Sequence, residues 1–125
     1  MSPQGLVVQP VGFAFARIAA DEAEILTIGV SALHQSSGIG AALLRELAKS
    51  VRTHGAHRLF LEVAKNNAPA LKLYARAGFE KVGTRRGYYQ STNGTAMDAI
   101  IMARRLTGLA DNELMHPKAS MDAQR

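Results

Sequence analysis

An apolar strand that leads through a glycine-containing turn directly into an amphipathic helix constrains this chain most. Ile28 to Val30 ends the apolar run, and Gln35 to Ala41 forms the turn. Glycine lets a backbone approach an anion closely, and the first free N–H groups of a helix point at such an anion with the support of the helix dipole. The segment therefore predicts a site for a phosphate-bearing cofactor. On this segment alone, glycines that only make the turn tight are an equally good explanation.

Hydrophobic periodicity predicts an α/β domain with the element order β-β-β-α-β-α-β-β. The strand-helix-strand unit through the first helix requires a right-handed crossover between parallel neighbours, and ligands of such sheets collect at the carboxyl ends of the strands. The third strand is almost continuously apolar, which predicts burial on both of its faces. The predicted strands are Leu6–Val8, Val11–Ile18, Glu24–Val30, Arg58–Val63, Phe79–Tyr89 and Met97–Arg104, and the helices run from Gly38 to about His54 and from Asn67 to Gly78.

The composition excludes several classes of protein. A chain of 125 residues has the length of one domain. Because it contains no cysteine, a disulfide framework, a thiolate metal site and an acyl-cysteine intermediate are excluded. No apolar run approaches the roughly 20 residues of a membrane span, and the first residues lack the pattern of an export signal, so we expect a cytoplasmic protein. The net charge of +5 favours an anionic partner, either nucleic acid or a phosphorylated cofactor.

Several blocks in one order and spacing resemble the GNAT N-acetyltransferases, and most closely the RimI type, the ribosomal-protein-alanine N-acetyltransferases. The resemblance covers roughly Val11 to Leu106 and implies a GNAT-like acyl-CoA N-acyltransferase fold, a mixed central sheet with flanking helices. We expect residues 1–106 to form this domain and residues 107–125 a polar C-terminal tail. The blocks are Gln35-x-x-Gly38-x-Gly40, Leu61-Glu62-Val63, Asn67-Ala68-Pro69-Ala70-Leu71 with Leu73-Tyr74, Gly78-Phe79, Arg85-Arg86-Gly87-Tyr88-Tyr89 and Asp98-Ala99-Ile100-Ile101-Met102.

The sequence departs from the family pattern at two places. Family members begin with a further strand and two helices before the segment that starts here near Leu6, and these elements help to cover the sheet and form one wall of the acceptor groove. The resemblance therefore implies an N-terminally shortened form or a misassigned start codon. In addition, Ser36 stands where the family often has a basic residue, and Ala32 where it often has proline. A neutral donor at position 36 gives up the charge-assisted part of a phosphate contact.

The resemblance implies that acetyl-CoA is the cosubstrate and assigns residues to its two ends. Backbone N–H groups of the turn hold the pyrophosphate, while the strand before the turn splays from its parallel neighbour and pairs with the pantetheine arm. A backbone N–H of that strand is a candidate oxyanion donor. A glycine in that strand suggests close approach by another chain or a ligand. Asn67 either caps the second helix or bonds the pantetheine arm. The cofactor-binding residues are Ile28, Gly29, Val30, Gln35, Ser36, Ser37, Gly38, Ile39, Gly40, Ala41 and Asn67.

Glu62 and Tyr74 are the catalytic residues that the resemblance implies. Glu62 is the general base and Tyr74 donates a proton to the departing thiolate; without the family, a surface glutamate and a core tyrosine are the expected explanations. An α-amine has a reference pKa near 7.7–8 and lysine about 10.4, so deprotonation at neutral pH costs lysine roughly 3.5 kcal/mol more. This favours an N-terminal acceptor. The interpretation requires that the turn aims the thioester at Glu62, and it predicts Glu62 on the same side of the sheet as Gly38 and Gly40.

The predicted reaction is direct transfer of an acetyl group, in a ternary complex, to the N-terminal α-amine of a protein, with a ribosomal protein as the expected acceptor. Acetylation of lysine or of a small amine by the same residues is the first alternative. A protein that binds coenzyme A without catalysis is the second, since the missing elements leave the acceptor side open unless a partner subunit or a second copy covers it. A nucleic-acid-binding domain ranks last because no binding motif is present. The four histidines have no ligand-like spacing, so no metal site is predicted.

Overall fold

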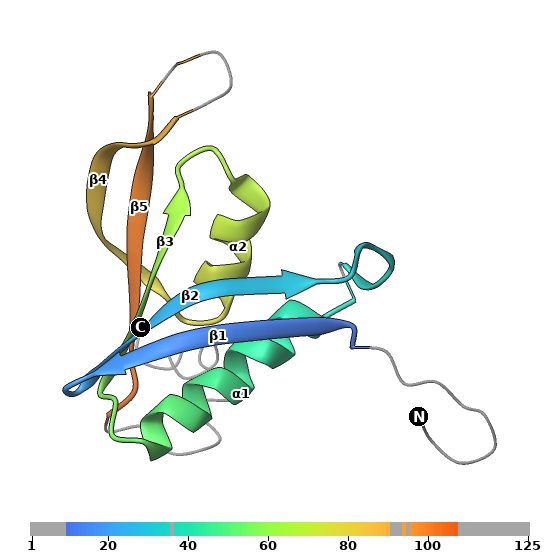
Figure 1. Ribbon diagram of the computed structural model, residues 1–125, viewed down its shortest axis with the longest axis vertical. Helices are drawn as coiled ribbons and strands as arrows, with labels where there is room; N and C mark the ends of the chain where they lie inside the picture. The colour runs from blue at the N-terminus through green and yellow to red at the C-terminus, as the bar shows by residue number, and fades with distance from the viewer. Residues whose placement is uncertain (1–9, 36, 91–93, 95, 108–125) are drawn as a thin grey trace, which may run out of the picture.

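The computed structural model describes residues 10–35, 37–90, 94 and 96–107, and it forms a mixed five-stranded sheet with the strand order β1-β2-β3-β5-β4. This confirms the predicted mixed α/β fold (Figure 1). The predicted strand Leu6–Val8 and the tail from residue 108 onward lie outside the described residues. The elements are β1 (Gly12–Ala19), β2 (Glu22–Val30), the 3₁₀ helix η2 (Ala32–His34), α1 (Ile39–Thr53), β3 (Arg58–Ala64), α2 (Ala68–Arg76), β4 (Glu80–Gln90) and β5 (Ala96–Arg105).

The hydrophobic core lies between one face of the sheet and the two helices. Three residues of α1 are buried there: Leu44, Ala48 and Val51. Every second residue of β3 joins the same cluster, as does Tyr74 of α2. Both helices therefore cover the same face of the sheet. None of the described helices is both long and apolar enough to span a bilayer.

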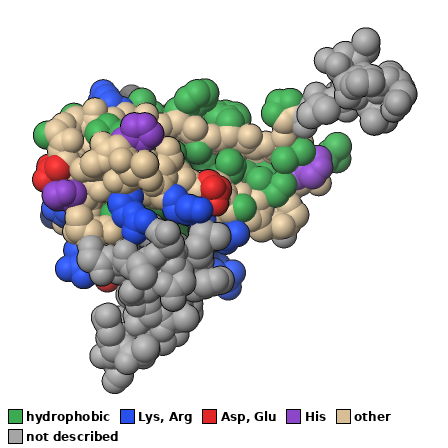
Figure 2. Space-filling model, turned by 90° about the horizontal axis from the view of Figure 1, so that it is seen from below, with side chains coloured by type: hydrophobic (Ala, Val, Ile, Leu, Met, Phe, Trp, Pro, Cys, Tyr) green, Lys and Arg blue, Asp and Glu red, His purple; other side chains and the backbone are tan. Residues whose placement is uncertain are grey.

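The opposite face of the sheet is open where β1 and β2 run. Phe13, Phe15 and Leu26 are large apolar side chains that remain exposed. The prediction that β2 is buried on both faces is therefore wrong, because both helices pack on the same side and the described residues place nothing over the other. Seen from below, hydrophobic side chains gather toward the right-hand end of the molecule, where β1 begins and β2 ends (Figures 1 and 2).

The parallel pair at the centre of the sheet is short. β2 pairs with β3 only from Glu22 to Glu24, opposite Arg58 to Phe60, while on its other side β2 pairs with β1 along its whole length. Beyond that point β2 and β3 diverge (Figure 1). The parallel crossover through α1 is as predicted, and so is the splaying of the strand before the turn. The backbone groups that β2 turns toward β3 after Glu24 consequently have no partner there.

Candidate active site

Among the described residues, no side chain caps the N-terminus of α1. Gly38 is the N-cap residue and has a φ of +88°, its carbonyl accepts from the Ala42 N–H at 3.0 Å, and the first turn contains no acidic residue. The N–H groups of Ile39, Gly40 and Ala41 precede the first intrahelical donor and have no partner within the helix. At α2, by contrast, the Asn67 side chain caps the helix. An uncapped N-terminus without nearby negative charge suits an anion.

Side chains of the turn hold the turn itself together. Gln35 donates from Nε2 to the Val30 carbonyl at 3.1 Å, and the Ser37 hydroxyl donates to the His34 carbonyl. The Val30 carbonyl is thus already paired, so it is less available to a pantetheine amide than the sequence suggests. Ser36 lies outside the described residues.

Packing within the chain explains why glycine is needed at two of the predicted cofactor-binding positions. A Cβ at Gly29 would lie 2.7 Å from a ring carbon of Phe13, so the close approach at this glycine is made by the chain's own aromatic side chain. A Cβ at Gly40 would lie 3.2 Å from Cδ2 of Leu73, so Gly40 lets the start of α1 approach α2. Gly38 differs, because a Cβ there meets no atom of the described residues within 4 Å and only its positive φ requires glycine.

Asn67 serves as a helix cap. Its Oδ1 accepts from the Ala70 N–H at 3.2 Å, and Pro69 follows within the first turn. Of the two roles that the sequence leaves open, capping is confirmed for the side-chain oxygen. A bond to a cofactor stays a prediction for the side-chain nitrogen.

A β-bulge in β2 is a site feature that the sequence analysis missed. Phe15 pairs with Thr27 and Ala16 with Ile25, so Leu26 is the extra residue in this strand. A bulge leaves one residue out of the ladder and bends the strand. It lies two residues beyond the last pair with β3, where the two strands begin to diverge. No turn former or proline marks the position in the sequence.

Glu62 lies on the open face of the sheet. Its neighbours Leu61 and Val63 are buried in the core beneath the helices, and the strand alternates, so the Glu62 side chain points the other way. The prediction of Glu62 on the same side as Gly38 and Gly40 is therefore wrong, because α1 packs on the helix-covered face. The turn does not aim at Glu62 directly, and a cofactor held at the turn would reach it only between β2 and β3, where the two strands diverge. The carboxylate Oε2 accepts from Arg85 Nη1 at 3.1 Å, and the Glu62 side chain is 21% exposed.

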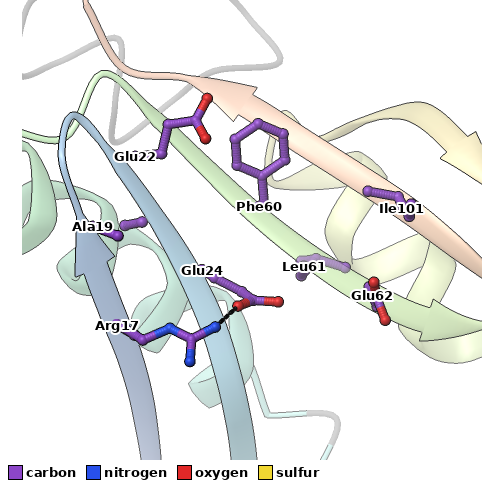
Figure 3. Close-up of a pocket in the computed structure, with 9 residues that line it drawn as sticks. Arg17, Ala19, Glu22, Glu24, Phe60, Leu61, Glu62 and Ile101 are labelled. Carbon is purple, nitrogen blue, oxygen red and sulfur yellow. Dashed lines mark hydrogen bonds and ion pairs between the residues drawn. The ribbon is translucent and has the colours of Figure 1, made fainter.

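A cavity of about 300 Å³ lies beside Glu62 on that open face, over the junction of β2 and β3. Figure 3 shows Glu24 and Glu62 projecting from neighbouring strands on the side away from the helices. Glu24 pairs with Arg17 at 2.6 Å, so this second carboxylate is neutralised by an arginine, as Glu62 is by Arg85. The lining residues are Arg17, Ala19, Glu22, Ala23, Glu24, Phe60, Leu61, Glu62 and Ile101.

Tyr74 lies on the helix-covered face. It is 8% exposed, and its ring packs edge-on against Phe79 with 6.0 Å between the centroids. The structure therefore places the two predicted catalytic side chains on opposite faces of the sheet. Glu62 is on the side of the open cavity, and Tyr74 is on the side of α1 and its uncapped N-terminus.

A mixed five-stranded sheet with helices packed on it is the fold of the GNAT acyl-CoA N-acyltransferases. A sequence profile of the acetyltransferase (GNAT) family matches residues 7–79, and the chain belongs to this family.

Within this family, the chain is similar in sequence to N-acetyltransferases that act on protein N-termini, according to their names. The chain is 42% identical over 91 residues to the ribosomal protein bS18-alanine N-acetyltransferase of Escherichia coli K12, covering 73% of this chain and 61% of that protein. It is 44% identical over 75 residues to the N-alpha-acetyltransferase RimI of Mycobacterium tuberculosis, covering 60% and 46%. The chain thus spans less than two thirds of the length of these relatives.

Solved structures give the same picture. The ribosomal-protein-S18-alanine N-acetyltransferase of Escherichia coli superposes with a TM-score of 0.72 at 38% identity, covering 82% of this chain and 65% of that one. NAA60 of Arabidopsis thaliana, in complex with a bisubstrate analogue, gives a TM-score of 0.75 at 25% identity and covers 86% and 71%.

Proposed function

We propose that this chain transfers an acetyl group from acetyl-CoA to the N-terminal α-amine of a protein. The observation that carries the proposal is the divergence of β2 from β3 directly beside the uncapped N-terminus of α1. A cofactor arm lying between these strands would connect the helix-covered face with the open face. We infer that acetyl-CoA enters along α1 and that the acceptor approaches Glu62 from the open side.

The residues of the turn fit the pyrophosphate and pantetheine parts of this cosubstrate. The backbone N–H groups at the start of α1 bind the phosphate oxygens, because they have no partner within the helix. The backbone groups of β2 after Glu24 that face away from β1, apart from the Val30 carbonyl, bind the pantetheine amides as an added strand would. The cofactor set remains Ile28 to Val30, Gln35 to Ala41 and Asn67, within a domain of residues 1–106.

The two catalytic residues act from the two faces. The acceptor nitrogen forms a bond to the thioester carbon while Glu62 takes a proton from that nitrogen, and the carbon–sulfur bond breaks. Tyr74 gives its proton to the departing sulfur on the cofactor side. A backbone N–H of β2 near the bulge at Leu26 stabilises the negative charge on the carbonyl oxygen. Base and acid on opposite faces suit transfer between two ligands that arrive from opposite sides.

The acceptor proposed is the N-terminus of a ribosomal protein in the cytoplasm. The names of the relatives from Escherichia coli and Mycobacterium tuberculosis support an N-terminal acceptor. A small amine is the second candidate, because nourseothricin acetyltransferase also superposes, with a TM-score of 0.70 at 30% identity. The exposed Phe13, Phe15 and Leu26 support the finer proposal that a second copy or a partner subunit covers the acceptor side.

Calorimetry with acetyl-CoA, followed by a thiol-release assay, tests the function. We expect binding, and thiol release with peptides whose N-terminus is free but not with the same peptides carrying a blocked N-terminus and a free lysine. Tight binding without turnover on any amine would contradict the enzymatic proposal. Turnover on lysine or on small amines alone would contradict the N-terminal acceptor.

Replacing Gly38 by alanine should weaken acetyl-CoA binding about tenfold, equivalent to about 1.4 kcal/mol. The substitution disfavours the positive φ that places the free N–H groups, although no atom of the described residues blocks the new Cβ. Gly55→Ala is the matched control, because Gly55 has a φ of +98° after the other end of α1 and equally open surroundings. Both variants should lose about 1–2 kcal/mol of unfolding free energy. Equal affinities of the two variants in calorimetry would refute the phosphate site.

Replacing Tyr74 by phenylalanine should lower kcat about 10²-fold, the lower end of the range for general acid catalysis. The ring that packs against Phe79 is kept, so the unfolding free energy should change by no more than about 1.5 kcal/mol. Stopped-flow measurement of thiol release reports kcat, and acetyl-CoA affinity serves as the internal control. An unchanged kcat would remove Tyr74 from the mechanism.

A further inference from the structure

We propose that Arg85 is the positioning residue of Glu62 and that an irregular segment of β4 is built to hold it there. The proposal rests on the proposed function, in which Glu62 is the general base. Arg85 Nη1 donates to Glu62 Oε2 at 3.1 Å, bridging β4 to β3 across the intervening strand β5. The bond uses one carboxylate oxygen and leaves the other available to take a proton from the acceptor.

The segment from Arg85 to Tyr89 departs from a regular ladder. Arg85 pairs with Ala99 and Tyr89 with Met97, so β4 advances four residues where β5 advances two. Gly87 lies inside this bulge with a φ of +63°, and its N–H donates to Asp98 Oδ1 at 2.9 Å. The Asp98 carboxylate thereby fixes a backbone conformation that only a residue such as glycine adopts easily.

The bulge brings Tyr88 and Arg85 together. The Arg85 guanidinium carbon lies 4.1 Å from the centre of the Tyr88 ring, a cation–π contact. A hydrogen bond with Tyr88, and after it the charges of Glu62 and Glu24, raise the pKa of Arg85 above its ordinary value against the effect of burial. Without the extra residues, alternation along the strand would place positions 85 and 88 on opposite faces. The bulge therefore allows the Tyr88 ring to contact the Arg85 guanidinium.

These contacts give Glu62 one defined orientation beside the cavity. A glutamate on an otherwise open sheet face has several rotamers, and a general base must lie within hydrogen-bond reach of the proton that it removes. The planar guanidinium, held between Tyr88 and Glu62, limits that freedom. The contacts run from Asp98 through Gly87 to Tyr88 and Arg85, and end at the base.

Steady-state kinetics of Arg85 variants test the proposal in the full chain. Arg85→Gln should lower kcat about tenfold or more and leave the KM and calorimetric Kd for acetyl-CoA within about twofold. Arg85→Lys should recover only part of the loss, because an ammonium lacks the planar fork. Lys81→Gln, which removes an equal charge from an exposed position on the same strand, should match the wild type. Arg85→Gln with an unchanged kcat would overturn the proposal.

A double variant separates this proposal from the proposed function. If Arg85 acts through Glu62, then Arg85→Gln added to Glu62→Gln should cause no further loss of kcat. A full additional loss would show that Arg85 acts independently and would overturn the positioning role alone. Glu62→Gln with wild-type kcat would overturn the base assignment and this inference with it.

A variant away from the cavity tests the bulge. Asp98→Ala removes the acceptor for the Gly87 N–H and should lower kcat in the direction of Arg85→Gln, again with acetyl-CoA affinity kept. Asp98→Asn retains an oxygen at that position and should restore at least half of the lost kcat. Equal kcat values for Asp98→Ala and the wild type would overturn the role of the bulge.

Discussion

Glu62→Gln should reduce kcat by about 10²–10⁴-fold, the range that general base catalysis contributes. The amide keeps the size of the side chain and an oxygen that accepts from Arg85, but it cannot take a proton from the acceptor amine. The Glu62 side chain is on the open face, away from the proposed cofactor site at α1. The Kd for acetyl-CoA should therefore stay within about twofold. Thiol release under saturating acceptor peptide measures the change.

The control for this variant is Glu80→Gln, which removes a carboxylate from an exposed position at the start of β4. It should retain full activity. A Glu62→Gln variant that binds acetyl-CoA and keeps full turnover would refute the base assignment. In that case the carboxylate is a surface residue of an alternating strand, which is the explanation that the residue pattern alone favours.

Leu59→Ala should lower the free energy of unfolding by about 2–5 kcal/mol. Leu59 is 0% exposed and lies on β3 in the single core cluster that joins the sheet to the two helices. Because domains are stable by only about 5–15 kcal/mol, this loss is a large share of the total. The midpoint and slope of urea denaturation measure it.

Leu33→Ala is the matched control for Leu59→Ala, since the same atoms are removed from a leucine that is 91% exposed. It should change the unfolding free energy by less than about 0.5 kcal/mol. Comparable losses from both substitutions would mean that the exposed leucine is covered in solution. That result would locate a partner or a second copy next to the turn before α1.

The sequence predicted most of the fold because its local signals agree. Helical periodicity predicted α1, and Asn67 with Pro69 predicted the start of α2. The parallel crossover and the splayed β2 were also predicted. Burial of β2 on both faces was predicted wrongly, because an almost continuously apolar sequence does not show whether one face of the strand is covered or both. Leu26 escaped prediction since a bulge depends on the register with another strand.

In the candidate site, too, some features were predicted from the sequence and others depend on the tertiary structure. The local pattern predicted the turn, and the family resemblance implied roles for Glu62 and Tyr74, but the face of the sheet on which Glu62 lies was predicted wrongly. The sequence also suggested that a ligand approaches Gly29 and Gly40, whereas the Phe13 ring lies against Gly29 and Leu73 lies against Gly40. Arg85 lies in one of the blocks that resemble the family, and 23 positions separate it from Glu62. No local pattern connects residues that far apart.

The sequence by itself predicted most of the elements, the glycine turn before α1 and the chemical types at the candidate site, since periodicity, glycine and caps act over a few residues. Only the tertiary structure decided where β2 leaves β3, that Glu62 and Tyr74 lie on opposite faces of the sheet, and that Arg85 reaches Glu62. Each of these depends on the register between strands distant in the chain, and register is set by packing of the whole sheet.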